Sequence, residues 1–312
     1  MKIIVTGSLG NISKPLTEIL VAQGHDVTVV SSDPEKQTAI QALGATPAIG
    51  SIQDVQFLMH TFKGADAVYA MIPLSFTEPD LGEYMHRVGT NYTLAIKETG
   101  IKRVVLLSGW AANLVKAENL EHLFDELNAS VTIMRPAAFY TNFYQSMDLI
   151  KGKGLIGKSL TLRHSGLWAL LSGKTGLLMG NYGGDDRIIF VSPIDIADAV
   201  TEELLIAPTD KTIRYVGSEE MTCNEAARII GTAIGKPWLK WVLLSDEQML
   251  QGLKMAKLPD KLAESLVEMQ AAMHSGKQWN SLTATGQKWV KSNWLISLRS
   301  LQQFIIKINS YI

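Results

Sequence analysis

The sequence predicts an α/β protein built on a doubly wound parallel sheet, with a smaller, mostly helical C-terminal domain. Through the first half of the chain, short runs rich in β-branched residues alternate with longer amphipathic segments. Strand and helix in alternation imply parallel strands joined by right-handed crossovers, with helices on both faces of the sheet. After Arg135-Pro136 the alternation gives way to glycine-rich loops and apolar helices, which indicates a second unit.

Each predicted strand is a short apolar run bounded by Gly, Asp, Asn or Lys, and a helical pattern follows it. Strands are expected at Ile3–Val5, Val27–Val30, Thr46–Ile49, Ala67–Ile72, Val104–Leu107 and Val131–Met134. Helices are expected near Ser13–Gln23, Pro34–Leu43, Val55–Phe62, Leu81–Thr99 and Lys116–Asn128. The elements expected to return to the main sheet are Ile188–Val191, Ile194–Leu205 and Thr212–Val216. A helix rich in Met, Leu and Ala is expected near Asp246–His274.

These elements divide the chain into two domains. The first covers residues 1–140 together with the returning segments at about 188–216. The second is a smaller substrate domain that covers residues 141–187 and 217–312 and is therefore discontinuous.

Composition limits the classes of protein to which the chain can belong. Its 312 residues are 46% hydrophobic and 19% charged, which suits a globular protein with a substantial core. The formal net charge is −1 and basic residues do not cluster, so a nucleic-acid partner is not expected. Cys223 is the only cysteine and the six histidines are scattered, so we expect neither a disulfide nor a metal site.

The hydrophobic segments are too short to suggest export or a membrane span. The apolar run at Ile3–Val5 lacks the length of a signal peptide. The segment Gly166–Gly180 is the most hydrophobic stretch, but a bilayer span needs about 20 apolar residues. We therefore expect a cytoplasmic protein with a small-molecule acceptor and no membrane partner, and the sequence leaves an oligomer or a protein partner open.

The stretch VTGSLGNIS follows the first predicted strand and opens the first predicted helix. Backbone N–H groups and the positive end of the helix dipole meet there and attract a diphosphate. Gly7 permits a tight turn, and Gly10 lets the backbone approach the phosphates. Ser13 stands where the fingerprint has a third glycine, which costs packing room without removing an N–H donor. We expect dinucleotide binding to tolerate this change.

The end of the second strand bears on the choice between NADP and NAD. An NAD site would place a carboxylate there to accept the ribose hydroxyls, but the chain has Ser31. Ser31, Ser32 and Lys36 are able to donate to a 2′-phosphate, so NADP (NADPH) is favoured and NAD stays possible. The alternative is that the two serines cap the helix that begins at Pro34 while Lys36 is solvated.

Six stretches in order resemble the NmrA-like branch of the atypical short-chain dehydrogenase/reductase superfamily. They are VTGSLGNIS, GSIQD at Gly50–Asp54, KRVVLLSG at Lys102–Gly109, HLFDEL at His122–Leu127, TIMRPAAFYTNF at Thr132–Phe143 and FVSPIDIADAV at Phe190–Val200. The resemblance covers most of the chain. It implies a Rossmann domain that binds NAD(P) and a smaller domain that forms a cleft over the nicotinamide.

The resemblance also implies roles for individual residues. The residues expected to line the pyrophosphate are Gly7, Ser8, Leu9, Gly10, Asn11 and Ile12. Those expected to run along the rest of the cofactor are Asp54, near the adenine, and Ala70, Met71 and Ile72. Those expected beside the substrate are Tyr140, Asn142 and Phe143. Asp54 is also a plausible helix N-cap.

The Tyr-x-x-x-Lys pair of ordinary short-chain dehydrogenases is absent from the sequence. In the segment where it should fall, His122 occupies the expected lysine place and is a candidate proton donor. Packing beside Glu126 is its alternative role. Ser108 is a second catalytic candidate, or it simply ends a strand, and Trp110 either stacks on an aromatic acceptor or lies at the surface.

Two functional classes fit these residues. One is an NADP-dependent oxidoreductase that passes hydride to a quinone or a similar small carbonyl acceptor, which requires positioning more than a dedicated acid. The other is a non-catalytic NAD(P)-binding redox sensor that acts through a protein partner. Three further charged residues are expected to be structural, Arg135 in a salt bridge and Asp195 and Asp198 at a helix N-terminus.

Overall fold

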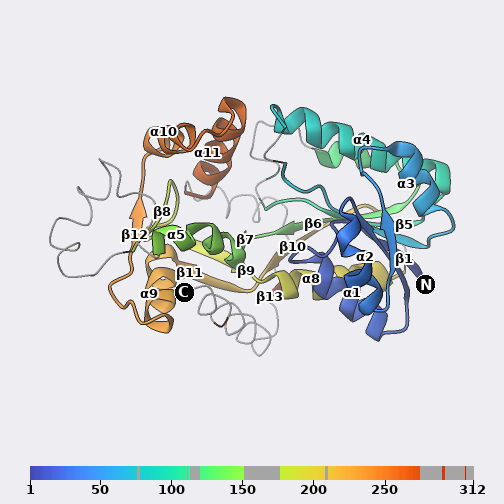
Figure 1. Ribbon diagram of the computed structural model, residues 1–312, viewed down its shortest axis with the longest axis horizontal. Helices are drawn as coiled ribbons and strands as arrows, with labels where there is room; N and C mark the ends of the chain where they lie inside the picture. Colours follow the sequence, from blue (N-terminus) through green and yellow to red (C-terminus); the bar gives the residue numbers. More distant parts are fainter. Residues whose placement is uncertain are drawn as a thin grey trace.

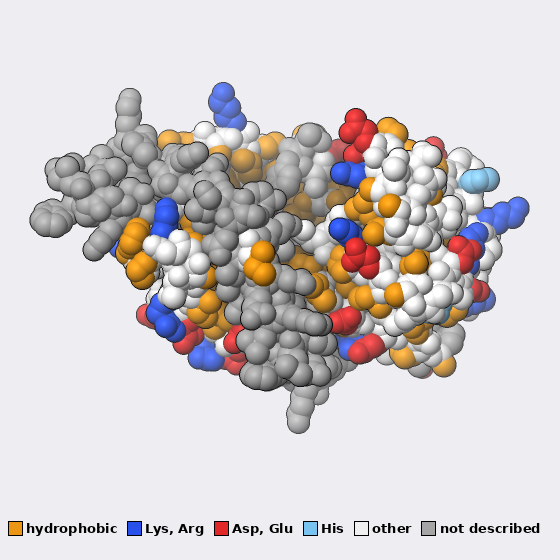
Figure 2. Space-filling model, turned by 60° about the horizontal axis from the view of Figure 1, so that its bottom comes forward, with side chains coloured by type: hydrophobic (Ala, Val, Ile, Leu, Met, Phe, Trp, Pro, Cys, Tyr) orange, Lys and Arg blue, Asp and Glu red, His pale blue; other side chains and the backbone are white. Residues whose placement is uncertain are grey.

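The structure is a computed structural model that describes residues 1–75, 78–110, 112, 120–150, 176–207, 210–274, 290–291 and 306. Most of the apolar stretch Gly166–Gly180 lies outside the described residues, as do residues 116–119 of one predicted helix. Among the described helices, none combines the length and the hydropathy needed to cross a membrane. Acidic and basic side chains are interspersed over the described residues on the face shown in Figure 2.

The main sheet is parallel throughout, as the sequence predicts. Its strand order is β13-β10-β6-β5-β4-β1-β2-β3. The strands are β1 (Lys2–Val5), β2 (Asp26–Ser31), β3 (Thr46–Ile49), β4 (Ala67–Ala70), β5 (Arg103–Leu107), β6 (Ser130–Pro136), β10 (Thr212–Gly217) and β13 (Val290–Lys291). From β1 the strand order runs to β2 and β3 on one side, and then to β4 and the later strands on the other side. The carboxyl end of β1 is therefore the switch point of the sheet.

Helices cover both faces of this sheet (Figure 1). They are α1 (Ser13–Ala22) and α8 (Pro193–Leu205) on one face, α3 (Val55–Phe62) and α4 (Leu81–Thr99) on the other, with η1 (Pro34–Lys36) and α2 (Gln37–Ala42) after β2. Successive residues of β1 divide between the two cores, because side chains of a strand alternate. Ile3 and Val5 belong to one core and Ile4 to the other, and all three are fully buried.

Two predicted elements differ from the structure. The described part of Lys116–Asn128 forms only a short 3-10 helix, η2 (Leu120–Phe124), and not a long α-helix. The strand expected at Ile188–Val191 is present as β9 (Arg187–Val191), but it is not part of the main sheet. Instead β9 pairs with β7 (Ala138–Phe139) and antiparallel with β11 (Glu219–Thr222) in a separate sheet.

The strand β9 is buried on both faces and separates two cores. Ile189 and Val191 pack into the core that contains α1 and α8. Ile188 and Phe190 pack into the core of a smaller lobe. We define the smaller lobe as the described residues of 138–150, 176–191 and 218–274. Because the side chains of β9 alternate between its two faces, this one strand packs the smaller lobe against the core of the main domain.

The remaining elements of the smaller lobe include helices and a second small sheet. They are η3 (Tyr140–Ser146), α5 (Met147–Ile150), β8 (Leu178–Gly180), α9 (Cys223–Ala233), β12 (Trp241–Leu243), α10 (Asp246–Met255) and α11 (Asp260–His274). The single helix expected near Asp246–His274 is thus two helices. Lys257 adopts φ +63° between them, and Pro259 lacks the N–H that a continuous helix needs there.

The helix α11 contacts the Rossmann part of the chain. Leu262 is fully buried in the core that contains α3 and α4. Lys261 Nζ lies 2.7 Å from Asp80 Oδ2, and Asp80 also caps α4 by accepting from Glu83 N. Among the described residues, the smaller lobe contacts the main domain along β9 and also, separately, through α11 (Figure 1).

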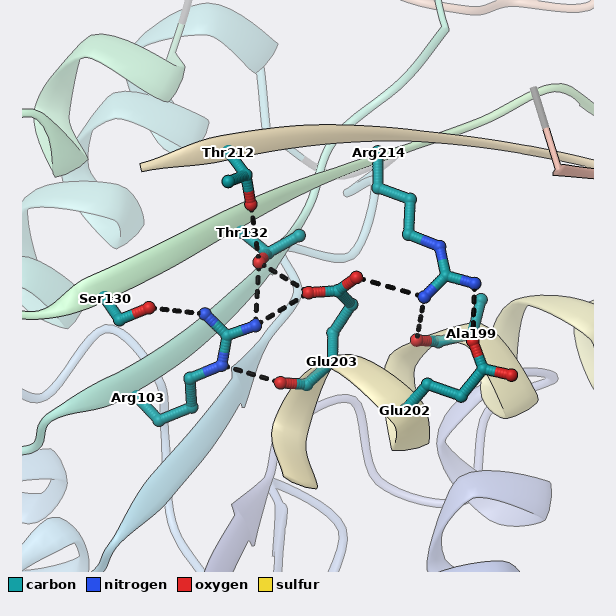
Figure 3. Close-up of polar contacts among 8 residues, drawn as sticks. All are labelled: Arg103, Ser130, Thr132, Ala199, Glu202, Glu203, Thr212 and Arg214. Carbon is teal, nitrogen blue, oxygen red and sulfur yellow. Dashed lines mark hydrogen bonds and ion pairs between the residues drawn. The ribbon is translucent and has the colours of Figure 1, made fainter. Parts of the chain in front are cut away.

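A buried polar network closes the amino-terminal edge of the sheet, opposite the glycine loop (Figure 3). The Arg103 guanidinium lies 2.8 Å from one Glu203 oxygen and donates to Ser130 and Thr132. The other Glu203 oxygen accepts from Arg214 at 3.0 Å. Since Glu203 belongs to α8 and its partners to β5, β6 and β10, the network fastens this helix to three strands.

Removal of the Glu203 charge should destabilise the fold without changing the opposite edge of the sheet. We expect Glu203→Gln to lower the free energy of unfolding by about 3 kcal/mol, because it leaves the buried Arg103 charge uncompensated. Glu202→Gln is the matched control, since the Glu202 side chain is 64% exposed against 13% for Glu203 and its pair with Arg214 should contribute at most about 1 kcal/mol. Urea unfolding measures both. Equal small losses would contradict the structural role of the network.

The single cysteine offers a second test of the packing. Cys223 is fully buried at the start of α9, where burial raises the pKa of its thiol to about 12. We expect no alkylation by iodoacetamide at pH 8 in the native protein and rapid alkylation in denaturant, because only the thiolate reacts. Mass spectrometry counts the adducts. Rapid native labelling would show that the core of the smaller lobe opens readily.

Candidate functional site

The glycine loop after β1 leaves no room for side chains at its first glycine. Gly7 has φ +89°, and a Cβ there would lie 2.6 Å from Ser13 Oγ and 2.8 Å from Met71 Cγ. A Cβ at Gly10 would lie 3.0 Å from the Gly7 carbonyl oxygen. Ser8 also has a positive φ, +55°. The loop between β1 and α1 is thus a tight turn with little room for side chains at Gly7 and Gly10.

Ser13 replaces the third glycine through a hydrogen bond that the sequence did not predict. Its buried hydroxyl donates to the Thr6 carbonyl at 2.8 Å. Thr17 in turn donates to the Ser13 carbonyl at 2.7 Å. The serine therefore ties the start of α1 to the end of β1, and its side chain fills the space beside Gly7.

The backbone of the loop fits a diphosphate. The N–H groups of Leu9, Asn11 and Ile12 make no backbone hydrogen bond within the described residues. The helix α1 follows at Ser13, and no side chain caps its N-terminus. Free N–H groups at a helix N-terminus bind phosphate oxygens, and the helix dipole favours their charge. Gly7 and Gly10 allow the tight turn that presents these N–H groups, because a Cβ at either position would collide with Ser13, Met71 or the loop backbone.

Thr6 fixes the end of β4 beside this loop. Its hydroxyl accepts from Met71 N at 2.8 Å and lies 3.1 Å from the Tyr69 carbonyl oxygen. Tyr92 of α4 donates to the Met71 carbonyl at 2.9 Å. Ala70, Met71 and Ile72 were predicted to run along the cofactor, and these bonds hold the segment next to Gly7. Thr6 and Tyr92 were missed because their partners lie far away in the sequence.

Ser31 lies beside the loop at the carboxyl end of β2. Ser8 Oγ donates to Ser31 Oγ at 2.8 Å, and Ser31 Oγ accepts from Asp33 N at 3.2 Å. Asp33, and not either serine, caps the following turn by accepting from Glu35 N. The alternative in which Ser31 and Ser32 act as the helix caps is therefore wrong. Ser32 and Lys36 are exposed at the same strand end.

Asp54 is the N-cap of α3, which confirms its alternative role. One carboxylate oxygen accepts from Gln56 N and Phe57 N at 2.9 and 3.1 Å. The loop before it is held by α4, since Asn91 Nδ2 donates to the Gln53 carbonyl at 3.0 Å. Its predicted place near the adenine remains a prediction.

Ser108 and Arg135 meet on one carboxylate that the sequence did not single out. Ser108 Oγ donates to Glu121 Oε1 at 2.6 Å. Arg135 donates to both oxygens of Glu121, from Nε at 2.9 Å and from a terminal nitrogen at 2.6 Å. Its other terminal nitrogen donates to the Tyr215 hydroxyl at 2.8 Å. The salt bridge predicted for Arg135 is confirmed, and its partner is Glu121.

This ion pair is buried at the carboxyl edge of the sheet. The Glu121 and Arg135 side chains are 6% and 4% exposed. Burial acts to lower the pKa of Arg135, but the hydrogen bonds and charge of Glu121 outweigh it, so the pKa of Arg135 lies above its usual value. Ser108 is half-buried and directly follows β5, so it is the member of the network nearest the surface.

His122 occupies a different environment from Ser108. Its side chain is 74% exposed, and Nδ1 lies 3.1 Å from Asp125 Oδ2. Asp125 also pairs with Lys211. In this segment Glu121, the residue before His122, is the one that contacts Ser108. The predicted catalytic roles of Ser108 and His122 therefore remain predictions, and these contacts do not bring the two side chains together.

The predicted substrate residues are mostly packed against other aromatic rings. Trp110 is buried and meets Tyr215 edge-on, with ring centroids 4.7 Å apart. Tyr140 stacks on Phe190 at 5.6 Å, and Phe143 lies at the same distance from that ring. Those two side chains belong to the core of the smaller lobe. Asn142, between them in sequence, is exposed.

Asp195 has the structural role expected of it. It is buried near the start of α8, where Ser218 donates to its carboxylate and also accepts from Ser192 N. Burial, and then the charges of Asp195 and Glu202, raise the pKa of Asp198. Within the described ranges, no group of three or more His, Cys, Asp or Glu side chains is placed to hold a metal ion.

A family model for NAD(P)H-binding proteins matches residues 7–155. This range begins at the glycine loop and includes β2 to β6. The match confirms the predicted resemblance to NAD(P)H-binding proteins over this part of the chain.

Two curated relatives match parts of the chain. A 4-hydroxy-2-methyl-3-oxo-4-farnesyl-3,4-dihydroquinoline-1-oxide ketoreductase from Stigmatella aurantiaca is 30% identical over 112 residues, 35% of this chain. A decarboxylating sterol-4-alpha-carboxylate 3-dehydrogenase from Dictyostelium discoideum is 32% identical over 66 residues, 21% of this chain. The matches span only 33% and 20% of the lengths of these relatives.

Solved structures resemble the chain over nearly its whole length. An NADPH-dependent quinone oxidoreductase from Escherichia coli, solved with NADPH, has a TM-score of 0.69 at 17% identity and covers 95% of this chain and 99% of its own. A triphenylmethane reductase from Citrobacter sp. has a TM-score of 0.67 at 16% identity and covers 99% of this chain and 100% of its own. These similarities confirm the predicted fold class.

Substitution of Gly7 should weaken dinucleotide binding through steric conflict. We expect Gly7→Ala to weaken binding of the dinucleotide at least tenfold, because the new Cβ would displace Ser13 or Met71. Gly24→Ala is the matched control, since Gly24 has φ +81° and nothing lies within 4 Å of its Cβ position. It should cost about 1–2 kcal/mol of stability and leave binding unchanged. Calorimetric titration and urea unfolding separate the two effects, and similar affinities for both variants would disprove the role of the loop.

Proposed function

We propose that the protein is an NADP-dependent oxidoreductase of the NmrA-like type that transfers hydride from NADPH to a quinone or a similar small carbonyl acceptor. The observation that carries the proposal is the glycine loop, whose tight turn leaves backbone N–H groups available to a pyrophosphate at the N-terminus of α1. The quinone oxidoreductase with the same fold supports the class of acceptor. The ketoreductase relative supports carbonyl reduction.

NADPH is the proposed cofactor because a serine, and not a carboxylate, occupies the last position of β2. The end of β2 presents Ser31, already bonded to Ser8, followed by exposed Ser32 and Lys36. A 2′-phosphate would meet hydroxyl donors and a cation there, whereas an aspartate or glutamate would repel it. Two neighbours, the quinone oxidoreductase and the triphenylmethane reductase, were solved with NADPH or NADP(H).

The proposed substrate domain is residues 141–187 and 217–312, against residues 1–140 and 188–216 for the cofactor domain; it includes most of the smaller lobe, whereas β7 and most of β9 fall in the cofactor domain on this division. Hydride transfer to a quinone requires that the acceptor lie against the nicotinamide, and binding energy supplies most of that positioning. The chain itself would hold the cofactor and orient the acceptor, while the nicotinamide supplies the hydride when bound. Cytoplasmic location remains a prediction from the sequence.

The decisive experiment measures turnover and binding in parallel. NADPH oxidation is followed at the nicotinamide absorbance with a panel of quinones and aldehydes, and binding is measured by calorimetry. We expect turnover with at least one quinone, and loss of both turnover and binding in Gly10→Asp. NADPH binding without turnover on any acceptor would instead favour the redox sensor, which needs the cofactor but no chemistry. A wild-type protein that binds no nicotinamide dinucleotide would overturn both.

Lys36 should discriminate between the two cofactors. We expect Lys36→Gln to weaken NADPH binding about two- to fivefold, the size of an exposed ionic contact, and to leave NADH binding unchanged. Lys63→Gln removes an exposed lysine at the end of α3 and is the control that should change neither. Calorimetric titrations with NADPH and NADH give the four affinities. Equal weakening of both dinucleotides would contradict a contact with the 2′-phosphate.

A further inference from the structure

The hydrogen bond from Ser108 to Glu121 fixes the direction of the serine hydroxyl. Both Glu121 oxygens accept N–H groups of the Arg135 guanidinium, at 2.9 and 2.6 Å. Glu121 therefore presents acceptors only, and the single hydrogen of Ser108 Oγ points toward it across 2.6 Å. Only lone pairs remain on Ser108 Oγ for any other partner.

Ser108 lies on the nicotinamide side of the switch point. A dinucleotide bound at the carboxyl edge has its pyrophosphate at the loop after β1, with its two halves extending in opposite directions across the sheet. The adenosine half lies toward β2, where Ser31 ends the strand. The nicotinamide half then lies toward β4 and β5, and Ser108 is the first residue after β5.

The two ligands expected at this end differ in what they offer to a hydroxyl that only accepts. A quinone carbonyl has no hydrogen to donate. The nicotinamide carboxamide has an NH2 group with two donors, as the amide of asparagine does. Donor and acceptor counting therefore pairs Ser108 with the cofactor and not with the carbonyl of the substrate.

We infer that Glu121, backed by Arg135, is a positioning residue that fixes Ser108 Oγ as the hydrogen-bond acceptor for the carboxamide N–H of the nicotinamide. This inference rests on the proposed use of a nicotinamide cofactor. It makes Ser108 a cofactor contact rather than a proton donor. A proton leaving Ser108 would create an alkoxide 2.6 Å from a carboxylate, which the repulsion of like charges opposes.

The test compares NADP with its 3-acetylpyridine analogue, in which a methyl ketone replaces the carboxamide. The analogue keeps the carbonyl and the shape but lacks the N–H donors. We expect the wild-type protein to bind NADP about tenfold more tightly than the analogue, the size of one well-formed hydrogen bond. Equilibrium binding by calorimetry or fluorescence gives the ratio and needs no turnover.

Variants then separate the positioning role from a structural one. Ser108→Ala should reduce the ratio to about one, because it removes the acceptor. Glu121→Gln should do the same, since its amide N–H can donate to Ser108 and turn the serine hydrogen outward. The double variant Ser108→Ala with Glu121→Gln should equal Ser108→Ala alone, because Glu121 acts through Ser108. Asp125→Asn, in the exposed neighbouring pair, should keep the wild-type ratio.

Folding failure does not remove the test. If Glu121→Gln alone is unstable, Glu121→Gln combined with Arg135→Met removes both buried charges, which is tolerated far better than removal of one. A folded Glu121 variant that keeps the tenfold ratio would overturn the inference. A wild-type ratio near one with normal NADPH-dependent quinone turnover would also overturn it while the proposed function stands. Absence of any dinucleotide binding would remove both.

Discussion

The buried ion pair between Glu121 and Arg135 is the interaction on which the carboxyl edge of the sheet depends. It connects η2 to β6 directly, reaches β10 through the Tyr215 hydroxyl, and reaches the end of β5 through Ser108. Two charges with so little exposure carry a desolvation cost that their attraction only roughly offsets. The pair therefore contributes fixed geometry more than net stability, and that geometry lies at the edge of the proposed cofactor site.

The two ends of the sheet use arginine in the same way for different purposes. At the amino edge, Arg103 and Glu203 form hydrogen bonds with hydroxyl groups, and Glu203 also pairs with Arg214. These charges are therefore paired within the protein (Figure 3). At the carboxyl edge, the corresponding network ends on a half-buried serine. One network fastens a helix to strands, whereas the other leads toward a surface where a ligand is expected.

Local pattern was enough to predict most of the main domain. Short β-branched runs between turn residues located β1 to β6, and an aspartate before an apolar period located the start of α3. Tertiary pairing was not readable in the same way. The sequence predicts β9 as a strand but cannot say which sheet accepts it, since its residues are apolar on both faces. Pro259 is a local signal for the break between α10 and α11, because it lacks the N–H that a continuous helix needs.

The site was predictable where it depends on backbone and not where it depends on long-range contacts. The glycines of the loop can be recognised in the sequence because their backbone conformation and surroundings leave no room for another residue type. His122 is the predicted proton donor because histidine titrates near neutral pH. The adjacent Glu121, however, is the residue that contacts Ser108. No spacing rule would pair Thr6 with the end of β4 either, because 65 positions separate Thr6 from Met71. Such contacts come from strand order, which is a property of the assembled sheet.

The strand β9 also has a mechanical consequence. Because its four buried side chains, Ile188 to Val191, pack alternately into two cores, the strand cannot slide or tilt without opening voids in both cores. The strand is therefore a rigid connection between the two cores. Any motion of the smaller lobe against the sheet is therefore expected at the other contact, where among the described residues Lys261 pairs with Asp80 and Leu258, Leu262 and Leu266 pack against the core that contains α4. Solvent would enter the molecule first from that side.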